Sequence, residues 1–136
     1  MVARVVRPLI ARQHALGHAA IDLDHKAIAD WWIRAVGCEQ VQFQFFLARL
    51  KKLLRSHFDH EAALMRQAGG MLCPYHRQEH QTLLDLCDQV AREAERNWRS
   101  AQALLRRPFA RMIREHILSM DQCAVMFLNT REEAQG

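Results

Sequence analysis

Glycine and proline are scarce in this chain of 136 residues, which has 5 Gly and 3 Pro. Runs of β-branched residues are also few, whereas apolar residues recur with a helical spacing over long stretches. Together these features exclude a sheet protein and predict an all-α fold. Half of the residues are hydrophobic, and the length suits one domain with a single buried core.

Cysteine motifs and long apolar runs are lacking as well. The four cysteines, Cys38, Cys73, Cys87 and Cys123, are widely spaced and form no C-x-x-C pair. We expect reduced thiols that are mostly small core residues. No apolar run reaches transmembrane length, and residues 1–12 lack the apolar core of a secretory signal. The sequence therefore predicts a soluble, cytoplasmic protein with no transmembrane segment.

Acidic residues are absent before Asp22, and the formal net charge is +4. The basic residues stand singly or in pairs, among them Arg4, Arg7, Arg12, Lys51, Lys52, Arg55, Arg106, Arg107, Arg111 and Arg114. This scatter is typical of solvated helix faces. We expect no nucleic-acid partner, because such a site would require a basic stripe on one face. An anionic partner or a membrane surface stays open for the N-terminal arm.

Four helices are predicted from the apolar periodicity and from the residues that end helices. The first three are expected over about residues 21–36, 39–68 and 74–96. Gly37 ends the first helix, and Pro74 suits the first turn of the third. Ser100 is the predicted N-cap of the fourth helix, in which Pro108 predicts a kink or a short separate turn.

Two pairs of metal-type ligands have the same spacing on the second and third helices. They are His57 with Glu61, and His76 with His80. Residues four apart lie on one face of a helix, with Cβ atoms about 6 Å apart, which suits two ligands of one ion or of two adjacent ions. The Gly69-Gly70 turn between them would make the two pairs face each other. Both pairs stand in apolar stripes, where a metal ion is the most economical partner for buried imidazoles and a carboxylate.

The first and fourth helices add further ligand types. His25 falls on the apolar face of the first helix, and His116 on that of the fourth. His116 and Asp121 are five residues apart, which is about 140° around an ideal helix, so we expect a π-bulge that brings both to one site. The complete set is His25, His57, Glu61, His76, His80, His116 and Asp121. Because one zinc ion takes four ligands, this set suits two octahedral ions that share both carboxylates.

Four segments resemble the bacterial form of the hemerythrin family over about residues 17–128. They are I-D-L-D-H-K at 21–26, H-F-D-H-E-A-A-L-M at 57–65, H-R-Q-E-H at 76–80 and H-I-L-S-M-D at 116–121. The resemblance implies an antiparallel up-down-up-down four-helix bundle. We divide the chain into an N-terminal arm (1–20), a hemerythrin-like domain (21–130) and a C-terminal tail (131–136).

The resemblance also implies a cofactor of two iron ions joined by an oxo or hydroxo bridge. One iron would be held by His76, His80 and His116, the other by His25 and His57, and both by the bridging Glu61 and Asp121. O2 would bind reversibly at the second iron, for oxygen storage, delivery or sensing. The expected apolar pocket for O2 is Ile28, Phe58, Met112, Ile113 and Ile117. Gly70-Met71 stands where Tyr-Pro is common in the family. Met112 stands where the family usually has Trp, so the site would be roomier or more flexible.

Other interpretations stay open at this point. The site could belong to an enzyme or redox sensor that acts on peroxide or nitric oxide, or to a structural zinc or single-iron bundle. A homo-oligomer, or a separate redox or signalling partner, is also open. We expect His60 beside the ligands or exposed, and His14 and His18 exposed or capping. Trp31 is expected at an edge of the bundle, and the remaining methionines, Met65, Met71, Met120 and Met126, are expected to fill the core together with Met112.

Overall fold

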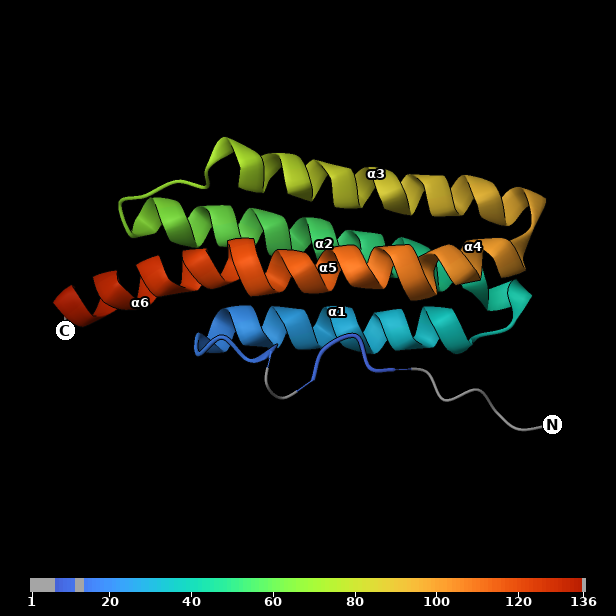
Figure 1. Ribbon diagram of the computed structural model, residues 1–136, viewed down its shortest axis with the longest axis horizontal. Helices are drawn as coiled ribbons and strands as arrows, with labels where there is room; N and C mark the ends of the chain where they lie inside the picture. The colour runs from blue at the N-terminus through green and yellow to red at the C-terminus, as the bar shows by residue number, and fades with distance from the viewer. Residues whose placement is uncertain (1–6, 12–13, 136) are drawn as a thin grey trace.

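The computed structural model describes residues 7–11 and 14–135. All regular structure in these residues is helical, which confirms the all-α prediction. Four long helical segments lie side by side along the long axis (Figure 1). The first three are α1 (Ala19–Gly37), α2 (Gln40–Gln67) and α3 (Pro74–Arg96). The fourth is continuous through α4 (Trp98–Leu104), η2 (Leu105–Phe109), α5 (Ala110–His116), η3 (Ile117–Asp121) and α6 (Gln122–Gln135).

Helix α1 begins at Ala19, two residues before the predicted start, because His18 caps it. The His18 Nδ1 accepts a hydrogen bond from the Ile21 amide at 3.4 Å, which confirms the capping role expected for this histidine. The His18 ring is buried, and its Nε2 lies 3.1 Å from Glu132 Oε1 on α6. The first and last helical segments are therefore joined at this end of the bundle.

The turn between α2 and α3 depends on two glycines. Gly69 has a φ of +83°, in the left-handed region, and Gly70 donates its amide to the Met65 carbonyl at 2.8 Å. A Cβ added to Gly70 would lie 2.7 Å from the Phe127 ring, so this position also packs closely against α6. The chain then enters α3 at Pro74, as predicted.

The fourth segment begins earlier than predicted, so the assignment of Ser100 as its N-cap is wrong. Asn97 is the cap: its Oδ1 accepts hydrogen bonds from the Arg99 and Ser100 amides, both at 3.1 Å. Asn97 has an extended backbone, as an N-cap residue requires. Ser100 consequently lies within the first helical turn.

Pro108 does not end the helix. The backbone passes through it as the π-helical turn η2, because a wider turn accommodates a residue that lacks an amide hydrogen. The indole of Trp32 on α1 donates to the Leu105 carbonyl in this turn at 2.8 Å. A neighbouring helix thus supplies a donor where the local hydrogen-bond ladder is irregular.

The core follows most, but not all, of the expected apolar residues. Met65 is buried, but Met71 and Met126 are 78% and 63% exposed, so the prediction that they fill the core is wrong. Met71 follows the glycine turn, where no helix covers it, and Met126 is on the outer face of α6. Trp31 is half-buried, with the Arg34 and Arg49 guanidinium groups over its ring, as expected for an edge position.

The cysteines are free thiols, but they are not mostly in the core. Cys87 is buried and Cys38 is half-buried, whereas Cys73 and Cys123 are exposed. Cys73 is exposed because it precedes α3, where its sulfur accepts a hydrogen bond from the His76 amide at 3.4 Å. The sequence prediction for Cys73 and Cys123 is therefore wrong.

The part of the N-terminal arm that the structure describes lies against the fourth segment. Leu9 is buried, and Arg114 on α5 donates to the carbonyls of Leu9 at 2.9 Å and Pro8 at 2.8 Å. Residues 1–6 and 12–13 of the predicted arm, and Gly136 of the predicted tail, lie outside the described residues. Helix α6 continues to Gln135. None of the helices in the described residues is both long and apolar enough to cross a membrane.

Candidate metal centre

The seven residues predicted as ligands meet in the interior of the bundle. Each is at most 7% exposed. They come from all four helical segments: His25 from α1, His57 and Glu61 from α2, His76 and His80 from α3, His116 from α5 and Asp121 from η3. Such burial of ionisable side chains is costly unless they have partners.

Two groups among these residues have the geometry of a metal site. The ligand atoms of His76, His80, His116 and Asp121 all lie within 4.8 Å of one another, and those of His25, His57 and Asp121 do the same. Asp121 belongs to both groups. The buried histidines and this aspartate could therefore hold metal ions, and the shared carboxylate places the two groups side by side.

The two oxygens of Asp121 point to different groups. Its Oδ1 lies 2.9 Å from His116 Nε2 and 3.1 Å from His76 Nε2. Its Oδ2 lies 2.8 Å from His25 Nε2 and 3.6 Å from His57 Nε2. One oxygen thus belongs with each set of imidazoles.

Glu61 divides its oxygens in the same way. Its Oε1 lies 2.6 Å from His76 Nε2 and 3.9 Å from His80 Nε2, whereas its Oε2 lies 3.2 Å from His57 Nε2. Two ligands at right angles around an ion with bonds of about 2.1 Å are about 3 Å apart. These separations therefore suit donors around common centres, with both carboxylates spanning the two groups.

The spacing of His116 and Asp121 works because the helix widens between them. Residues Ile117–Asp121 form the π-helical turn η3, which confirms the predicted π-bulge. Without it, five residues of α-helix would turn Asp121 about 140° away from His116. With it, Asp121 Oδ1 reaches the His116 ring.

Several donor atoms converge without forming hydrogen bonds. His57 Nε2, His80 Nε2, His116 Nε2 and both oxygens of Glu61 are buried and have no hydrogen-bond partner in the described residues. The His57 Nε2 and Glu61 Oε2 atoms, for example, lie 3.2 Å apart but do not form a hydrogen bond. Because orphaned buried polar atoms are costly, this arrangement fits a bound cation that all of them face.

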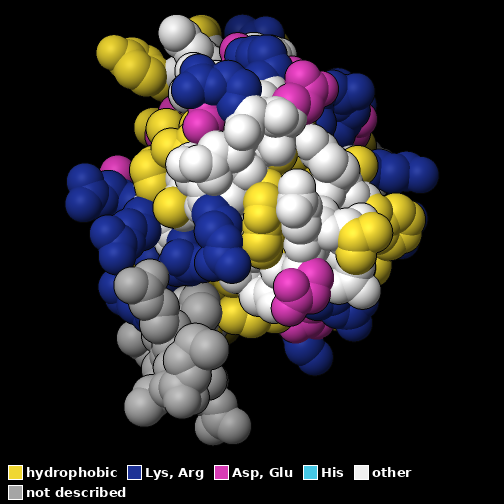
Figure 2. Space-filling view, turned by 90° about the vertical axis from the view of Figure 1, so that its right-hand side faces the viewer, with side chains coloured by type: hydrophobic (Ala, Val, Ile, Leu, Met, Phe, Trp, Pro, Cys, Tyr) yellow, Lys and Arg dark blue, Asp and Glu magenta, His cyan; other side chains and the backbone are white. Residues whose placement is uncertain are grey.

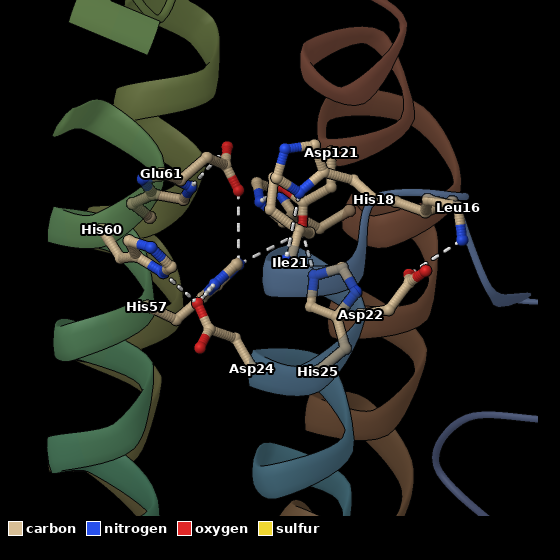
Figure 3. Close-up of polar contacts among 12 residues, drawn as sticks. Leu16, His18, Ile21, Asp22, Asp24, His25, His57, His60, Glu61 and Asp121 are labelled. Carbon is tan, nitrogen blue, oxygen red and sulfur yellow. Dashed lines mark hydrogen bonds and ion pairs between the residues drawn. The ribbon is translucent and has the colours of Figure 1, made fainter. Parts of the chain in front are cut away.

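Asp24 holds the outer side of one imidazole. Its Oδ2 lies 3.0 Å from His57 Nδ1 and 2.7 Å from His60 Nδ1, and Figure 3 shows it between the two rings. This contact leaves His57 Nε2 to face Glu61 and Asp121. Burial lowers the pKa of His57, but the nearby carboxylates of Asp121, Asp24 and Glu61 raise it well above its ordinary value. His60 is partly exposed and faces Asp24 rather than the centre, as expected.

Glu79 has a similar role on the opposite side. Its Oε2 lies 3.4 Å from His116 Nδ1. Sequence reasoning missed both Glu79 and Asp24. Each stands next to a ligand in the chain, but its partner is on a different helix, so no spacing along one helix indicates the contact.

Phe58 forms the aromatic wall of the centre. Its ring stacks on His80 with a centroid separation of 3.8 Å and an interplanar angle of 8°, and it also meets His57 and His116 at 5.8 and 6.2 Å. The other predicted pocket residues lie in the main core. Ile28, Ile113 and Ile117 are each 1% exposed, and Met112 is half-buried against them.

Two groups of the centre have the ionisation that metal ligands require. Burial raises the pKa of Asp121, but the imidazoles around it, that of His116 first, lower it well below its ordinary value. Burial lowers the pKa of His80 to about 2, and the neighbouring imidazoles add to this effect. Asp121 is therefore ionised and His80 is neutral, which are the forms that bind metals. Burial also lowers the pKa of His76, but the carboxylates of Asp121 and Glu61 raise it to about 9, so this ring would release a proton on binding a metal ion.

No family model matches this chain. No curated protein and no solved structure matches it either. What the centre can do therefore follows from its donor set of five imidazoles and two carboxylates. Imidazole suits zinc, copper, iron and nickel, and seven donors exceed the four of a zinc site.

Hollows at the surface reach three of the ligand imidazoles. One of about 410 Å³ is lined by His25, and one of about 440 Å³ by His80 and Phe58. A third, of about 540 Å³, reaches His76 and is lined mainly by apolar side chains, among them Met71 and Phe127. A small molecule can therefore come close to the buried centre from outside.

Proposed function

We propose that this chain is a hemerythrin-type protein that binds O2 reversibly at a centre of two iron ions. The strongest support is the arrangement of Glu61 and Asp121. Each directs one carboxylate oxygen to the first histidine group and its other oxygen to the second group. A carboxylate shared in this manner suits a pair of adjacent ions. The resemblance of the four ligand-bearing segments to the hemerythrin family favours iron over other metals.

The proposal includes the finer description of the chain. The helical segments would form an up-down-up-down four-helix bundle, with an arm over residues 1–20 and a tail over 131–136. Of these, residues 19–20 belong to α1, residues 131–135 belong to α6, and Leu9 of the arm packs in the main core. Metal centres of this kind are built from side chains on facing helices. We place the protein in the cytoplasm, where reduced thiols such as the exposed Cys73 and Cys123 persist.

The two groups would differ in their coordination. His76, His80 and His116 would hold one ion, and His25 and His57 the other, while both carboxylates bridge. The second ion has one imidazole fewer and so has an open position for O2. When bound, the iron pair supplies the electrons that O2 takes up on binding and returns on release.

The residues around the centre would keep it ready for O2. Asp24 and Glu79 hold the outer nitrogens of His57 and His116, which fixes the inward direction of their Nε2 atoms. Phe58 excludes water from the imidazole rings that it contacts, and the isoleucines of the core are themselves buried. A dry, apolar surround disfavours the loss of charged oxygen species and therefore favours release of O2 over irreversible oxidation.

The test is a count of iron and a visible spectrum recorded without oxygen, after exposure to air and again after its removal. We expect two irons per chain and an absorption band that appears with air and disappears under argon over repeated cycles. Irreversible oxidation with two irons would point to an enzyme or redox sensor acting on peroxide or nitric oxide. One metal ion per chain would favour a structural site. A His60→Gln variant is the matched control, because this ring faces Asp24 and not the centre.

A further inference from the structure

Five arginines from separate parts of the chain surround one surface hollow of about 540 Å³. The sequence shows them only as scattered basic residues, typical of solvated faces. Its lining residues are Arg7, His14, Trp32, Arg106, Arg107, Arg111, Arg114, Glu115 and Leu118. We call it the arginine hollow.

The fourth segment provides most of the arginine hollow. Arg111, Arg114, Glu115 and Leu118 follow the spacing of one helix face. Ile113, His116 and Ile117 are buried on the other side of the same helix. The arginine hollow is therefore on the outer face of the segment that carries His116 and shares none of the seven metal-type ligands.

The arm completes the arginine hollow. Arg114 donates to the carbonyls of Pro8 and Leu9, which holds the chain next to Arg7 against α5. Seen from one end of the bundle, Lys and Arg side chains gather at the lower left, with few Asp or Glu side chains among them (Figure 2). Residues distant in sequence thus join in one basic surface.

The charge of this surface is poorly balanced within the chain. Among the lining residues that the structure describes, Glu115 is the single carboxylate, against five arginines that stay protonated. Burial lowers the pKa of Arg114, and the positive charge of Arg7 lowers it further. The Nε of Arg106 is buried and has no hydrogen-bond partner in the described residues. The excess positive charge of the arginine hollow therefore lacks a counter-charge, which an anion would supply.

We propose that the arginine hollow binds a small phosphorylated anion. The guanidinium group is planar and presents paired donors that match phosphate oxygens. The volume falls within the range of about 300–1,000 Å³ found for small-molecule sites, so it suits a phosphate with an attached group better than a bare phosphate ion. Leu118, which is 45% exposed, offers apolar surface to that group.

The experiment is calorimetric titration of the metal-loaded full chain with inorganic pyrophosphate at low and at physiological salt. We expect saturable binding that weakens with salt. The double variant Arg107→Gln/Arg111→Gln removes two exposed arginines of the arginine hollow and should weaken binding at least tenfold, as expected for charged hydrogen bonds. The control, Arg92→Gln/Arg96→Gln, removes the same charge from exposed positions on α3 and should change binding less than about twofold.

Three results would overturn the proposal. One is no pyrophosphate binding at millimolar concentration, and another is equal weakening by both double variants, which would indicate bulk charge alone. The third is binding of phosphatidylserine vesicles, lost in Arg107→Gln/Arg111→Gln, with none of pyrophosphate. Iron content and the response to air should be unchanged in both double variants, so failure of this proposal is distinct from failure of the proposed metal centre.

Discussion

Glu61 and Asp121 are the two residues of the centre that no imidazole could replace. A carboxylate offers two oxygens that can face different ions, and here each oxygen has its own set of imidazoles. In Glu61→Gln or Asp121→Asn an NH2 group replaces one of these oxygens, and its nitrogen cannot bind a cation. We expect the metal content to fall from two ions per chain to one or fewer, measured by elemental analysis of the purified variants.

The control for this prediction is His60→Gln. His60 lies next to the ligands in the sequence, but its Nδ1 faces Asp24, so this variant should keep two ions per chain. Loss of metal in His60→Gln equal to that in Asp121→Asn, or two ions retained in Asp121→Asn, would contradict the bridging role of the carboxylates.

In the metal-free protein, His76 and His80 make the free energy of unfolding depend on pH. The pKa of His76 is about 9, above the 6.5 of an unfolded histidine, so the folded chain holds a proton on His76 that the unfolded chain has lost between these values. The stability that this proton contributes is complete below pH 6.5 and is lost as pH rises through 9. The pKa of His80 is about 2, so below pH 6.5 the unfolded chain binds a proton that the folded chain does not. The free energy of unfolding of the metal-free protein should therefore be greatest near pH 6.5, measured by urea unfolding from about pH 5 to 10.

Bound metal should reverse the pH dependence of the stability on the alkaline side of this maximum. When an ion occupies the Nε2 of His76, the ring cannot take up the proton, so the loaded protein should gain stability as pH rises from about 6 to 8. An unchanged profile on loading would mean that the metal binds elsewhere.

Among the elements, the turn between α2 and α3 contains a glycine with a left-handed backbone. Gly69 has a φ of +83°, where a side chain is strained. Gly69→Ala should lower the free energy of unfolding by about 1 kcal/mol, measured by urea denaturation. The turn sets how the His57/Glu61 pair faces the His76/His80 pair, so metal affinity should fall as well.

Gly37 is the matched control, since it ends α1 without a positive φ and a Cβ there would meet nothing within 4 Å. Gly37→Ala should be neutral or stabilise the protein by up to about 1 kcal/mol. Equal destabilisation by Gly37→Ala and Gly69→Ala would show that backbone strain is not the cause.

The fourth segment shows how far local rules reach. The five-residue spacing of His116 and Asp121 required a wider turn, and η3 is that turn. Asn97 is also a local capping signal, but the Ser100 hydroxyl is a second candidate for the N-cap. The sequence could not distinguish the two residues, because the N-cap is the one with an extended backbone, and only the structure shows that this is Asn97. Pro108 indicated an irregularity, but the π-helical form of the turn and the Trp32 donor that it meets came only from the structure.

In the whole molecule, the ligands tie together all four helical segments. A metal ion that binds the folded chain and not the unfolded one should stabilise the protein by about 4 kcal/mol when free metal is a thousandfold above its dissociation constant. For a chain of this size we expect a rise in Tm on the order of 10 °C when Fe(II) is added without oxygen to the metal-free protein. Asp121→Asn should show a much smaller rise, and an equal rise would place the bound metal outside this centre.

The sequence by itself determined the helical class, most helix boundaries and the seven residues that meet in the centre. These follow from local periodicity and from spacings of four and five residues, which decide which side chains share a face of one helix. Apolar neighbours on the same face then indicate that the ligands are buried. Such information is contained within each helix.

Only the tertiary structure decided which faces of different helices meet. It placed Asp24 against His57, Glu79 against His116, and Arg7 beside the arginines of α5. These contacts join residues without any fixed spacing along the chain, because they depend on how each helix is rotated against its neighbours. For the same reason the structure alone showed that Glu61 and Asp121 each divide their oxygens between two groups of imidazoles.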